Sequence, residues 1–462
     1  MTKFVFDREL VVRHDTTGPR YTSYPTAVQF HAGFDADEYR AECTRSVAAD
    51  PAKPLSIYVH IPFCSTLCFY CACNKIITRN KSKGEKYLEY LERELRLQGA
   101  LFPKSRGVVQ LHLGGGSPTF LSADQIRFLV RMLGRAFRLV TTAERDFSIE
   151  VDPRTVDADG IAELAATGFN RMSFGVQDFD PDVQRAVHRI QSREQTVRVL
   201  EAARSHGFRS INLDLIYGLP RQTPASFART LGDIIALKPD RLSLFNYAHL
   251  PDRFSPQQRI RAEELPSPEE KLDILQESVG ALTAAGYRHI GMDHFALPDD
   301  ELSRAQDDGT LHRNFQGYTT KGGCDLVGLG STAIGMVGDC YAQNHHALTD
   351  YYRKLDDGEP PVARGLLMNA DDRLRRDVIM SLMCYSRVSV PAIELRHGIE
   401  FWRYFAAESP ALERLQQDGL ASLRPDELAV TPPGRFLVRN VAMVFDRYLQ
   451  TAREQARFSR VI

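Results

Sequence analysis

Residues 57–71 read Ile-Tyr-Val-His-Ile-Pro-Phe-Cys-Ser-Thr-Leu-Cys-Phe-Tyr-Cys, an apolar β-like run followed at once by the thiols of Cys64, Cys68 and Cys71. Thiolates are soft ligands that suit iron–sulfur clusters and zinc. Three thiolates on one loop can hold a [4Fe–4S] cube and leave one iron without a protein ligand. An open position on a metal is where a substrate or cofactor binds. A fourth thiol, Cys73, is either a further ligand or a spare thiol beside the chemistry.

A zinc knuckle is the alternative interpretation of these cysteines. Zinc motifs usually pair one C-x2-C with a second pair farther along the chain. The remaining cysteines are scattered singly and form no second pair: Cys43, Cys324, Cys340 and Cys384. The spacing therefore favours an iron–sulfur cluster.

Length and composition narrow the class of protein. A chain of 462 residues predicts one large barrel plus an accessory domain. A net charge of -1 gives no electrostatic case for binding nucleic acid or a membrane surface. The first nine residues carry charges where a signal peptide needs an apolar stretch, and no run of apolar residues is long enough to span a bilayer. Eight cysteines in such a chain predict metal or redox chemistry in a reducing cytoplasm.

Short β-like runs alternate with helical patterns along the first half of the chain. The predicted strands are Leu55–Ile61, Val108–Leu113, Phe147–Val151, Arg171–Val176, Ser210–Ile216 and Arg241–Phe245. Ser122 has capping-box spacing ahead of a helix, and Gly168 and Gly207 stand where helices would end. Six strands alternating with helices predict an α/β fold, an open (β/α)6 partial TIM-type barrel. Ligands gather at the carboxyl ends of the strands in such folds.

The second half of the chain changes character. Strand-like segments are predicted at 290–295 and 325–330, and helices follow from about residue 365, with a short strand-like patch at 428–431. We expect a small, mostly helical, winged-helix-like domain there, for packing and covering the barrel more than for nucleic acid. The predicted organisation is an N-terminal, substrate-contacting extension over 1–50, the barrel plus its extension over 51–360, and the helical domain over 361–462.

Polar residues follow several predicted strands. A glycine-rich turn at 114–116 would let the backbone approach a ligand and offer N–H groups to an anion. Glu150, Gln177 and Asp214 end the next three strands, and Arg189 lies one helical span later, able to pair with a carboxylate through its fork. The alternatives are a solvated loop acid for Glu150 and a surface salt bridge for Arg189. Convergence of so many polar groups on one face favours a site.

The cysteine spacing, with Tyr70 just before the third cysteine, resembles the signature of the radical S-adenosylmethionine (SAM) superfamily. The turn Gly-Gly-Gly-Ser-Pro-Thr at 114–119 resembles that superfamily's GGE-type motif, which holds the amino group of SAM. Here Ser117 replaces the usual acidic residue, so another group must grip the ammonium.

Longer strings resemble one family within it, the oxygen-independent coproporphyrinogen III oxidases. They include GPRYTSYPT (18–26), YVHIPFC (58–64), IEVDPR (149–154), DLIYGLP (214–220), FNYAHLP (245–251), LHRNFQGYTT (311–320) and the terminal FSRVI (458–462). These strings run from one end of the chain to the other. Related haem-trafficking proteins typically lack GPRYTSYPT and the cysteine equivalent to Cys73.

The resemblance implies a [4Fe–4S] cluster and two SAM molecules. It implies that Cys64, Cys68 and Cys71 bind the cluster and that Cys73 acts in catalysis without binding iron. The residues implied around the first SAM are Tyr58, Gly115, Glu150 and Ile334. Those implied around the second are Tyr70, Gly116, Ser117, Gln177, Arg189, Asp214 and Ala248. Tyr70 is a phenylalanine in the best-known relatives, a change that keeps the ring.

The resemblance also implies the reaction. A 5′-deoxyadenosyl radical from SAM removes hydrogen from two propionates of coproporphyrinogen III, which lose CO2 and an electron and become the vinyl groups of protoporphyrinogen IX in anaerobic haem and porphyrin biosynthesis. The implied partner is an electron donor such as a flavodoxin or ferredoxin, with no nucleic acid and no membrane, and the implied enzyme is a cytoplasmic monomer. Arg20 and Arg189 would neutralise carboxylates.

Two other functions compete with this one. A haem-binding chaperone with the same barrel would bind without turnover, and a zinc-stabilised structural protein would have no cluster. The segment 18–26 bears on the choice, because it has no helical or strand periodicity and is unlikely to belong to a core. We expect it to fold over a flat macrocycle and place Arg20 near a carboxylate; the alternative is a disordered leader.

Overall fold

The structure is a computed structural model, and it describes residues 6–449. The chain divides into two compact units, each assembled from separate segments. The barrel unit comprises Phe30–Lys271 and Gly323–Leu367. The C-terminal unit comprises the described parts of Met1–Gln29, Leu272–Gly322 and Met368–Ile462. The string at 458–462 lies outside the described residues.

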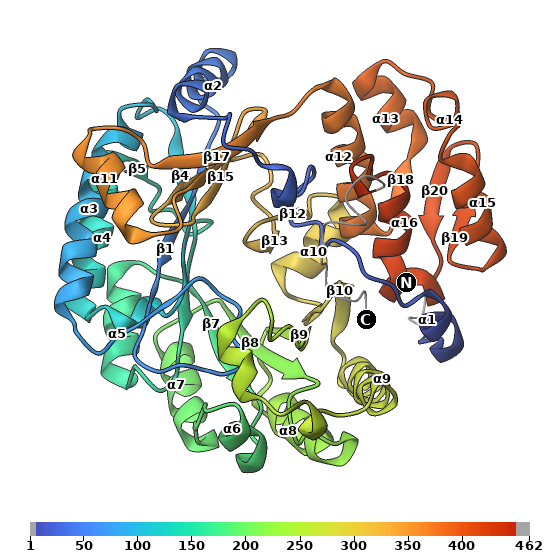
Figure 1. Cartoon of the computed structure of the whole chain (residues 1–462), viewed down its shortest axis with the longest axis horizontal. Helices are drawn as coiled ribbons and strands as arrows, with labels where there is room; N and C mark the ends of the chain where they lie inside the picture. Colours follow the sequence, from blue (N-terminus) through green and yellow to red (C-terminus); the bar gives the residue numbers. More distant parts are fainter. Residues whose placement is uncertain (1–5, 450–462) are drawn as a thin grey trace. The chain divides into compact units, whose positions relative to one another are not determined.

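All six predicted strands form in the barrel unit. They are β1 (Leu55–Ile61), β4 (Gly107–Gly115), β6 (Asp146–Val151), β7 (Arg171–Gln177), β8 (Ser210–Tyr217) and β9 (Arg241–Asn246). They lie side by side in the order β9-β8-β7-β6-β4-β1, and every pair is parallel (Figure 1). The predicted α/β fold, an open barrel of alternating strands and helices, is confirmed.

Helices connect these strands and cover the outside of the sheet (Figure 1). They are α3 (Ser82–Gly99), α4 (Ala123–Ala136), α5 (Ala158–Thr167), α6 (Pro181–Ala186), α7 (Arg193–Ser205) and α8 (Pro224–Leu237). The predicted capping box at Ser122 starts α4, because its hydroxyl accepts from the backbone N–H of Gln125. Gly168 ends α5 with φ 108°, a left-handed backbone that glycine adopts without strain.

The sheet continues past β1 with strands from far along the chain. They are β14 (Asp325–Leu329), β15 (Ile334–Val337), β16 (Cys340–Asn344) and β17 (Val362–Leu367). β14 pairs with β1 in parallel, and the other three follow in antiparallel order. Two further helices belong to the barrel unit, α2 (Ala36–Ala49) and α11 (Leu348–Asp356). The prediction of a strand near 325–330 is confirmed.

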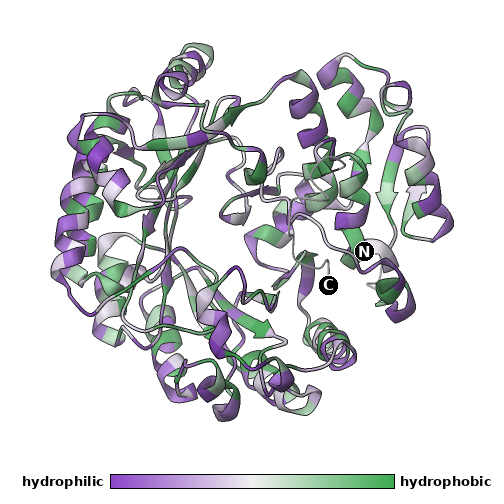
Figure 2. Cartoon of the chain, in the orientation of Figure 1, coloured by the Kyte–Doolittle hydropathy of each residue, from purple (hydrophilic) through white to green (hydrophobic). Residues whose placement is uncertain are grey.

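Burial explains why β1 forms the middle of this sheet. Leu55, Ile57, Val59 and Ile61 are fully buried, as expected for a parallel strand that is covered on both faces. The helices are mixed in character, with hydrophilic residues along their lengths, whereas the strands are mainly hydrophobic (Figure 2). The hydrophobic effect therefore holds the helices against the sheet.

The C-terminal unit is mostly helical, as predicted. Its helices are α1 (Arg8–His14), α10 (Glu301–Asp308), α12 (Ala370–Tyr385), α13 (Val390–His397), α14 (Phe401–Tyr404), α15 (Ser409–Gln417) and α16 (Val438–Val444), and α9 (Pro268–Ala284) crosses the boundary between the units. Three short strands form one sheet, with β20 (Glu427–Val430) between β18 (Arg387–Ser389) and β19 (Ala421–Leu423). The strand predicted at 290–295 is instead a hairpin, β10 (Arg288–Gly291) and β11 (His294–Ala296), because Met292 turns the chain with φ 52°.

The N-terminal segment belongs to the core of the C-terminal unit, and the expectation that it would not was wrong. Tyr21 and Tyr24 are 1% and 0% exposed within that core. The Tyr21 hydroxyl donates to Asp446 over 3.0 Å. Residues 6–29 and 272–322 therefore cluster with the C-terminal helices, whereas three consecutive segments were predicted. The pattern failed because two buried rings in a turn-rich segment leave no periodic signal.

Within residues 6–449, no helix combines the length and the apolar character needed to cross a bilayer.

Candidate active site

A cavity of about 670 Å³ opens at the carboxyl ends of the parallel strands in the barrel unit. Most of the residues singled out in the sequence line it: Cys64, Cys68, Tyr70, Cys71, Cys73, Gly115, Gly116, Ser117, Glu150, Gln177, Arg189 and Asp214. Tyr58, Ala248 and Ile334 are not among its lining residues. Tyr58 lies behind the glycine turn, where a Cβ on Gly114 would stand 3.0 Å from its ring.

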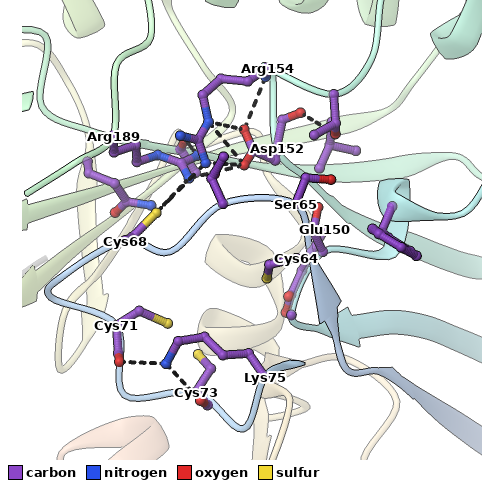
Figure 3. A pocket seen from close by; sticks show the side chains of 18 of the residues that line it. Cys64, Ser65, Cys68, Cys71, Cys73, Lys75, Glu150, Asp152, Arg154 and Arg189 are labelled. Carbon is purple, nitrogen blue, oxygen red and sulfur yellow. Dashed lines mark hydrogen bonds and ion pairs between the residues drawn. The ribbon is translucent and has the colours of Figure 1, made fainter. Parts of the chain in front are cut away.

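The cysteine loop is closed at both ends by a small two-stranded sheet that is separate from the barrel sheet. It leaves β2 (Phe63–Cys64) and returns along β3 (Ile76–Ile77), which pairs with β2 in parallel. The Lys75 ammonium donates to the carbonyls of Cys71 and Cys73 over 2.8 and 3.2 Å. These contacts hold the far end of the loop, where Cys71 and Cys73 lie together beside Lys75 (Figure 3).

The other end of the loop meets positive charge. Cys68 points toward two guanidiniums, with its sulfur 3.7 Å from Arg189 Nη1 and 3.8 Å from Arg154 Nη2 (Figure 3). Asp152 lies between the same two arginines, 3.2 Å from Arg189 Nη1 and 2.7 Å from Arg154 Nη2. Burial alone would raise the pKa of Asp152, but the two guanidiniums outweigh it and lower the pKa to about 2. The carboxylate is therefore ionised at neutral pH.

Arg189 is a buried site residue, so the surface salt bridge considered for it is wrong. It is 6% exposed, and its Nη2 donates to the carbonyl of Gly175 over 2.6 Å. Gly175 leaves room for these side chains, because a Cβ would stand 2.7 Å from Gln177 Nε2 and 3.1 Å from Arg189 Nη2. Arg189 Nε and Gln177 Oε1 are buried without a hydrogen-bond partner among the described residues. Two residues that line the cavity therefore keep a hydrogen-bonding group for a ligand: Arg189 a donor and Gln177 an acceptor.

The glycine turn at the end of β4 brings backbone close to the site. Gly115 has φ 116°, and a Cβ there would stand 2.7 Å from the ring of His60. A Cβ on Gly116 would stand 2.9 Å from backbone oxygens of Pro62 and Phe63. The N–H of Gly115 donates to Glu150 over 3.2 Å, so turn and carboxylate are joined. Any residue other than glycine at these two positions would keep the backbone from lying this close to its neighbours.

Asp214 differs from its predicted place at a strand end, because β8 runs on to Tyr217 and Asp214 lies inside it. Its carboxylate accepts from Asn212 over 2.7 Å and from Ser173 over 3.0 Å. Burial, with repulsion from Glu150, raises the pKa of Asp214 to about 6. This acid is therefore held beneath the cavity in a polar network.

The lining residues that the sequence analysis did not single out include Asp152, Arg154 and Ser173. The signal for the first two was present, because both lie within the string at 149–154 from which only Glu150 was taken. Asp152 lies two residues after Glu150, just beyond the end of β6, and the period-2 spacing of an extended chain would have identified it. Ser173 is an ordinary polar residue inside a strand and carries no such signal.

The donor set fits an iron–sulfur cluster. Three thiols of one loop line one cavity, thiolate is the ligand that such clusters use, and two guanidiniums beside Cys68 offer positive charge to an anionic group. The hydrogen bond from Cys73 lowers the pKa of Cys71, and Lys75 adds to this effect. Among residues 6–449, no three His, Cys, Asp or Glu side chains already surround one point, so the loop must bring its sulfurs together to bind.

Comparison with known proteins identifies the class and then the family. Residues 58–234 match the model of the Radical SAM superfamily, and residues 368–437 match the HemN C-terminal domain. Fold, cysteine loop and family models together define a radical SAM enzyme. An oxygen-independent coproporphyrinogen III oxidase from Pseudomonas aeruginosa is 53% identical over 99% of both chains. One from Escherichia coli K12 is 50% identical over 99% of this chain and 98% of its own. The chain belongs to the oxygen-independent coproporphyrinogen III oxidase family.

The solved structure of coproporphyrinogen III oxidase (HemN) from Escherichia coli, described as a radical SAM enzyme, agrees with this assignment. It superimposes with a TM-score of 0.92 at 49% identity, covering 97% of this chain and 100% of that chain. The predicted fold, family and enzyme class are therefore confirmed.

Proposed function

We propose that the chain converts coproporphyrinogen III to protoporphyrinogen IX without oxygen, by oxidative decarboxylation of two propionate side chains to vinyl groups. The observation that carries the proposal is the loop holding Cys64, Cys68 and Cys71, which lines one cavity at the carboxyl ends of the strands. Full-length similarity to enzymes named for this activity supports the choice of substrate.

We assign the three cysteines of that loop as ligands of a [4Fe–4S] cluster and Cys73 as a catalytic thiol that does not bind iron. When bound, the cluster supplies the electron that cleaves SAM to methionine and a 5′-deoxyadenosyl radical. Arg154 and Arg189 place two positive charges beside Cys68. Their charge stabilises an anionic group there, and Asp152 keeps both guanidiniums in place.

Two SAM molecules are proposed. Gly115 and Glu150 would hold the first, together with Tyr58, which lies behind the glycine turn, and with Ile334 at the start of β15. The second would contact Tyr70, Gly116, Ser117, Gln177, Arg189, Asp214 and Ala248. The buried free donor of Arg189 and free acceptor of Gln177 support this assignment, because the carboxylate and ammonium of an amino acid need one of each. With Ser117 in place of an acid, we assign the Gln177 amide and the Asp214 carboxylate, which line the same cavity, as acceptors for the ammonium.

The remaining partners follow from the reaction. A one-electron donor such as a flavodoxin or ferredoxin would supply the reducing equivalent, and the enzyme would act as a cytoplasmic monomer. Arg20 would help to neutralise a substrate carboxylate. It forms an ion pair with Asp293 in the C-terminal unit, so a propionate would have to share this guanidinium with Asp293.

Anaerobic incubation of the reconstituted enzyme with SAM, a reductant and coproporphyrinogen III tests the proposal. Mass spectrometry should detect loss of two CO2 molecules and four hydrogens from the substrate, and no change when SAM is omitted. Tight porphyrin binding without any change in mass would support a haem-binding protein instead.

A further inference from the structure

We propose that residues 75–86, which follow the cysteine loop, form a basic docking surface for an acidic one-electron carrier protein. The proposal rests on the proposed function, since it concerns how the cluster of that reaction receives its electron. We call Ile77, Arg79, Lys81, Lys83 and Lys86 the docking surface.

The docking surface begins next to the first cluster cysteine. Ile77 pairs with Cys64 across the β2–β3 ladder, and the N–H of Thr78 donates to the carbonyl of Cys64 over 2.9 Å. Neighbouring strands lie about 5 Å apart, so a protein seated on Ile77 comes close to the cysteine loop. Ile77 is 42% exposed, an apolar side chain at the point where charged residues begin.

Charge is concentrated in this segment. Residues 75–86 contain five basic residues and one acid, Glu85, although the whole chain carries a net charge of -1. Arg79, Lys81, Lys83 and Lys86 are all exposed. Among residues 6–449, no carboxylate forms an ion pair with Arg79 or Lys83. Lys86 lies over the ring of Tyr352, 5.4 Å from the ring centre. Lys81 lies over the ring of Phe120 at 4.1 Å, and its ammonium also donates to the carbonyl of Phe120.

Such a surface attracts a protein of opposite charge. A patch of one sign steers an oppositely charged partner and raises its association rate by roughly ten-fold to a thousand-fold at low salt. The electron balance requires a partner, because one electron must leave a donor and enter the cluster without any bond or proton being exchanged. An acidic flavoprotein or iron–sulfur carrier gives up one electron at a time and has the complementary charge. The alternative is that these basic residues are only a solvated helix end without a partner. The experiment must distinguish that alternative from a docking surface.

The test compares two charge-reversal variants of the reconstituted full-length enzyme. The first carries Arg79→Glu and Lys83→Glu, which change the charge of the docking surface by four units. The matched control carries Arg131→Glu and Arg198→Glu, an equal charge change at exposed positions of α4 and α7. Cluster reduction is followed by loss of visible absorbance in stopped flow, with reduced flavodoxin or with dithionite as the donor. Binding of flavodoxin is measured by calorimetry at low and at high salt.

The proposal predicts that the docking-surface variant is reduced by flavodoxin at least ten-fold more slowly than wild type and binds it correspondingly more weakly. High salt should remove most of the difference, because exposed charges are screened. Iron content and reduction by dithionite should stay at wild-type values, and the control variant should behave as wild type.

Equal reduction of the wild type and the docking-surface variant by flavodoxin would overturn the proposal. Equal slowing of both variants would also overturn it, since net charge alone would then be responsible. A wild-type enzyme that dithionite cannot reduce, or that cleaves no SAM when reduced, would instead refute the proposed function, and this inference with it.

Discussion

Asp152 is the residue on which the charges of the cavity depend. Its carboxylate bonds two guanidiniums, the half-buried Arg154 and the buried Arg189, and both of these face the sulfur of Cys68. Removing one partner of a buried ion pair leaves an uncompensated charge, which costs far more than loss of an exposed pair. The site therefore depends on an acid that contacts no cysteine itself.

Asp152→Asn should lower the free energy of unfolding by about 3–5 kcal/mol. The amide keeps the size of the side chain but leaves two guanidiniums without a countercharge. Asp124→Asn is the matched control, because Asp124 pairs with Arg127 while 88% exposed, and such pairs contribute about 1 kcal/mol or less. Chemical denaturation followed by circular dichroism measures both. Equal small losses would show that the Asp152 pairs do not stabilise the fold.

Cys64→Ala, Cys68→Ala and Cys71→Ala should each lose the cluster and all SAM cleavage, because two thiolates cannot hold the cube. Cys73→Ala should keep its iron and lose turnover. Iron analysis, with assay of 5′-deoxyadenosine, checks the four variants. Wild-type iron in any of the first three, or loss of iron in the fourth, would refute the ligand assignment.

The comparison of Glu150 with Asp152 shows which features of the site can be predicted from the sequence. Thiol spacing, glycine turns and strand-end acids were predicted correctly as lining one cavity, since each has a local signal. Asp152 could have been found from its place two residues after Glu150, but its pairing with Arg189 could not, because Arg189 lies 37 positions away in the sequence and 3.2 Å away in the structure. Residue type and spacing do not report such pairings.

At the scale of elements, the turn between β14 and β15 joins the sheet extension to the cysteine loop. Glu94 on α3 is fully buried and accepts from the N–H of Gly330 over 2.7 Å. Thr332 has φ 62°, a strained backbone for a β-branched residue. Its hydroxyl accepts from the side chain of Asn74, one residue after Cys73, over 3.3 Å. Glu94 therefore fixes one side of this turn, and the turn itself contacts the cysteine loop through Asn74.

Glu94 should make stability depend on pH. Burial raises its pKa from 4.5 to about 7, so the folded state favours the protonated acid. Protonated Glu94 contributes fully to the free energy of unfolding below pH 4.5, the pKa of the unfolded state. This contribution is lost as the pH rises to 7, which lowers the free energy of unfolding by roughly 3 kcal/mol. Glu94→Gln should remove this slope, and Glu89→Gln, an exposed change on the same helix, should keep it. Thermal unfolding between pH 5 and pH 8 measures the slopes; the same profile for all three proteins would contradict this role.

Elements differed in how well the sequence predicted them. The six barrel strands were found because each is an apolar run bounded by helical patterns. The placement of β14 beside β1 was not predicted, because its pairing partner is about 270 residues earlier in the chain. The C-terminal helices were predicted as a domain, but not the N-terminal segment that completes their core.

At the scale of the whole molecule, residues 6–29 contribute to the stability of the C-terminal unit. Deleting residues 1–29 should destabilise that unit, because it removes two fully buried tyrosines, and loss of one large buried ring costs about 3–5 kcal/mol. The barrel unit should keep its cluster. Calorimetry and limited proteolysis distinguish the two effects. Unchanged thermal transitions in the truncated chain would show that the segment is a dispensable leader.

The central claim is that one radical cleavage of SAM drives each decarboxylation at the cysteine-lined cavity. The most direct test counts 5′-deoxyadenosine and vinyl groups in one anaerobic reaction with coproporphyrinogen III. We predict one 5′-deoxyadenosine per vinyl group and therefore two per protoporphyrinogen IX, and neither product with Cys71→Ala. Vinyl product formed without 5′-deoxyadenosine, or formed by Cys71→Ala, would contradict the account.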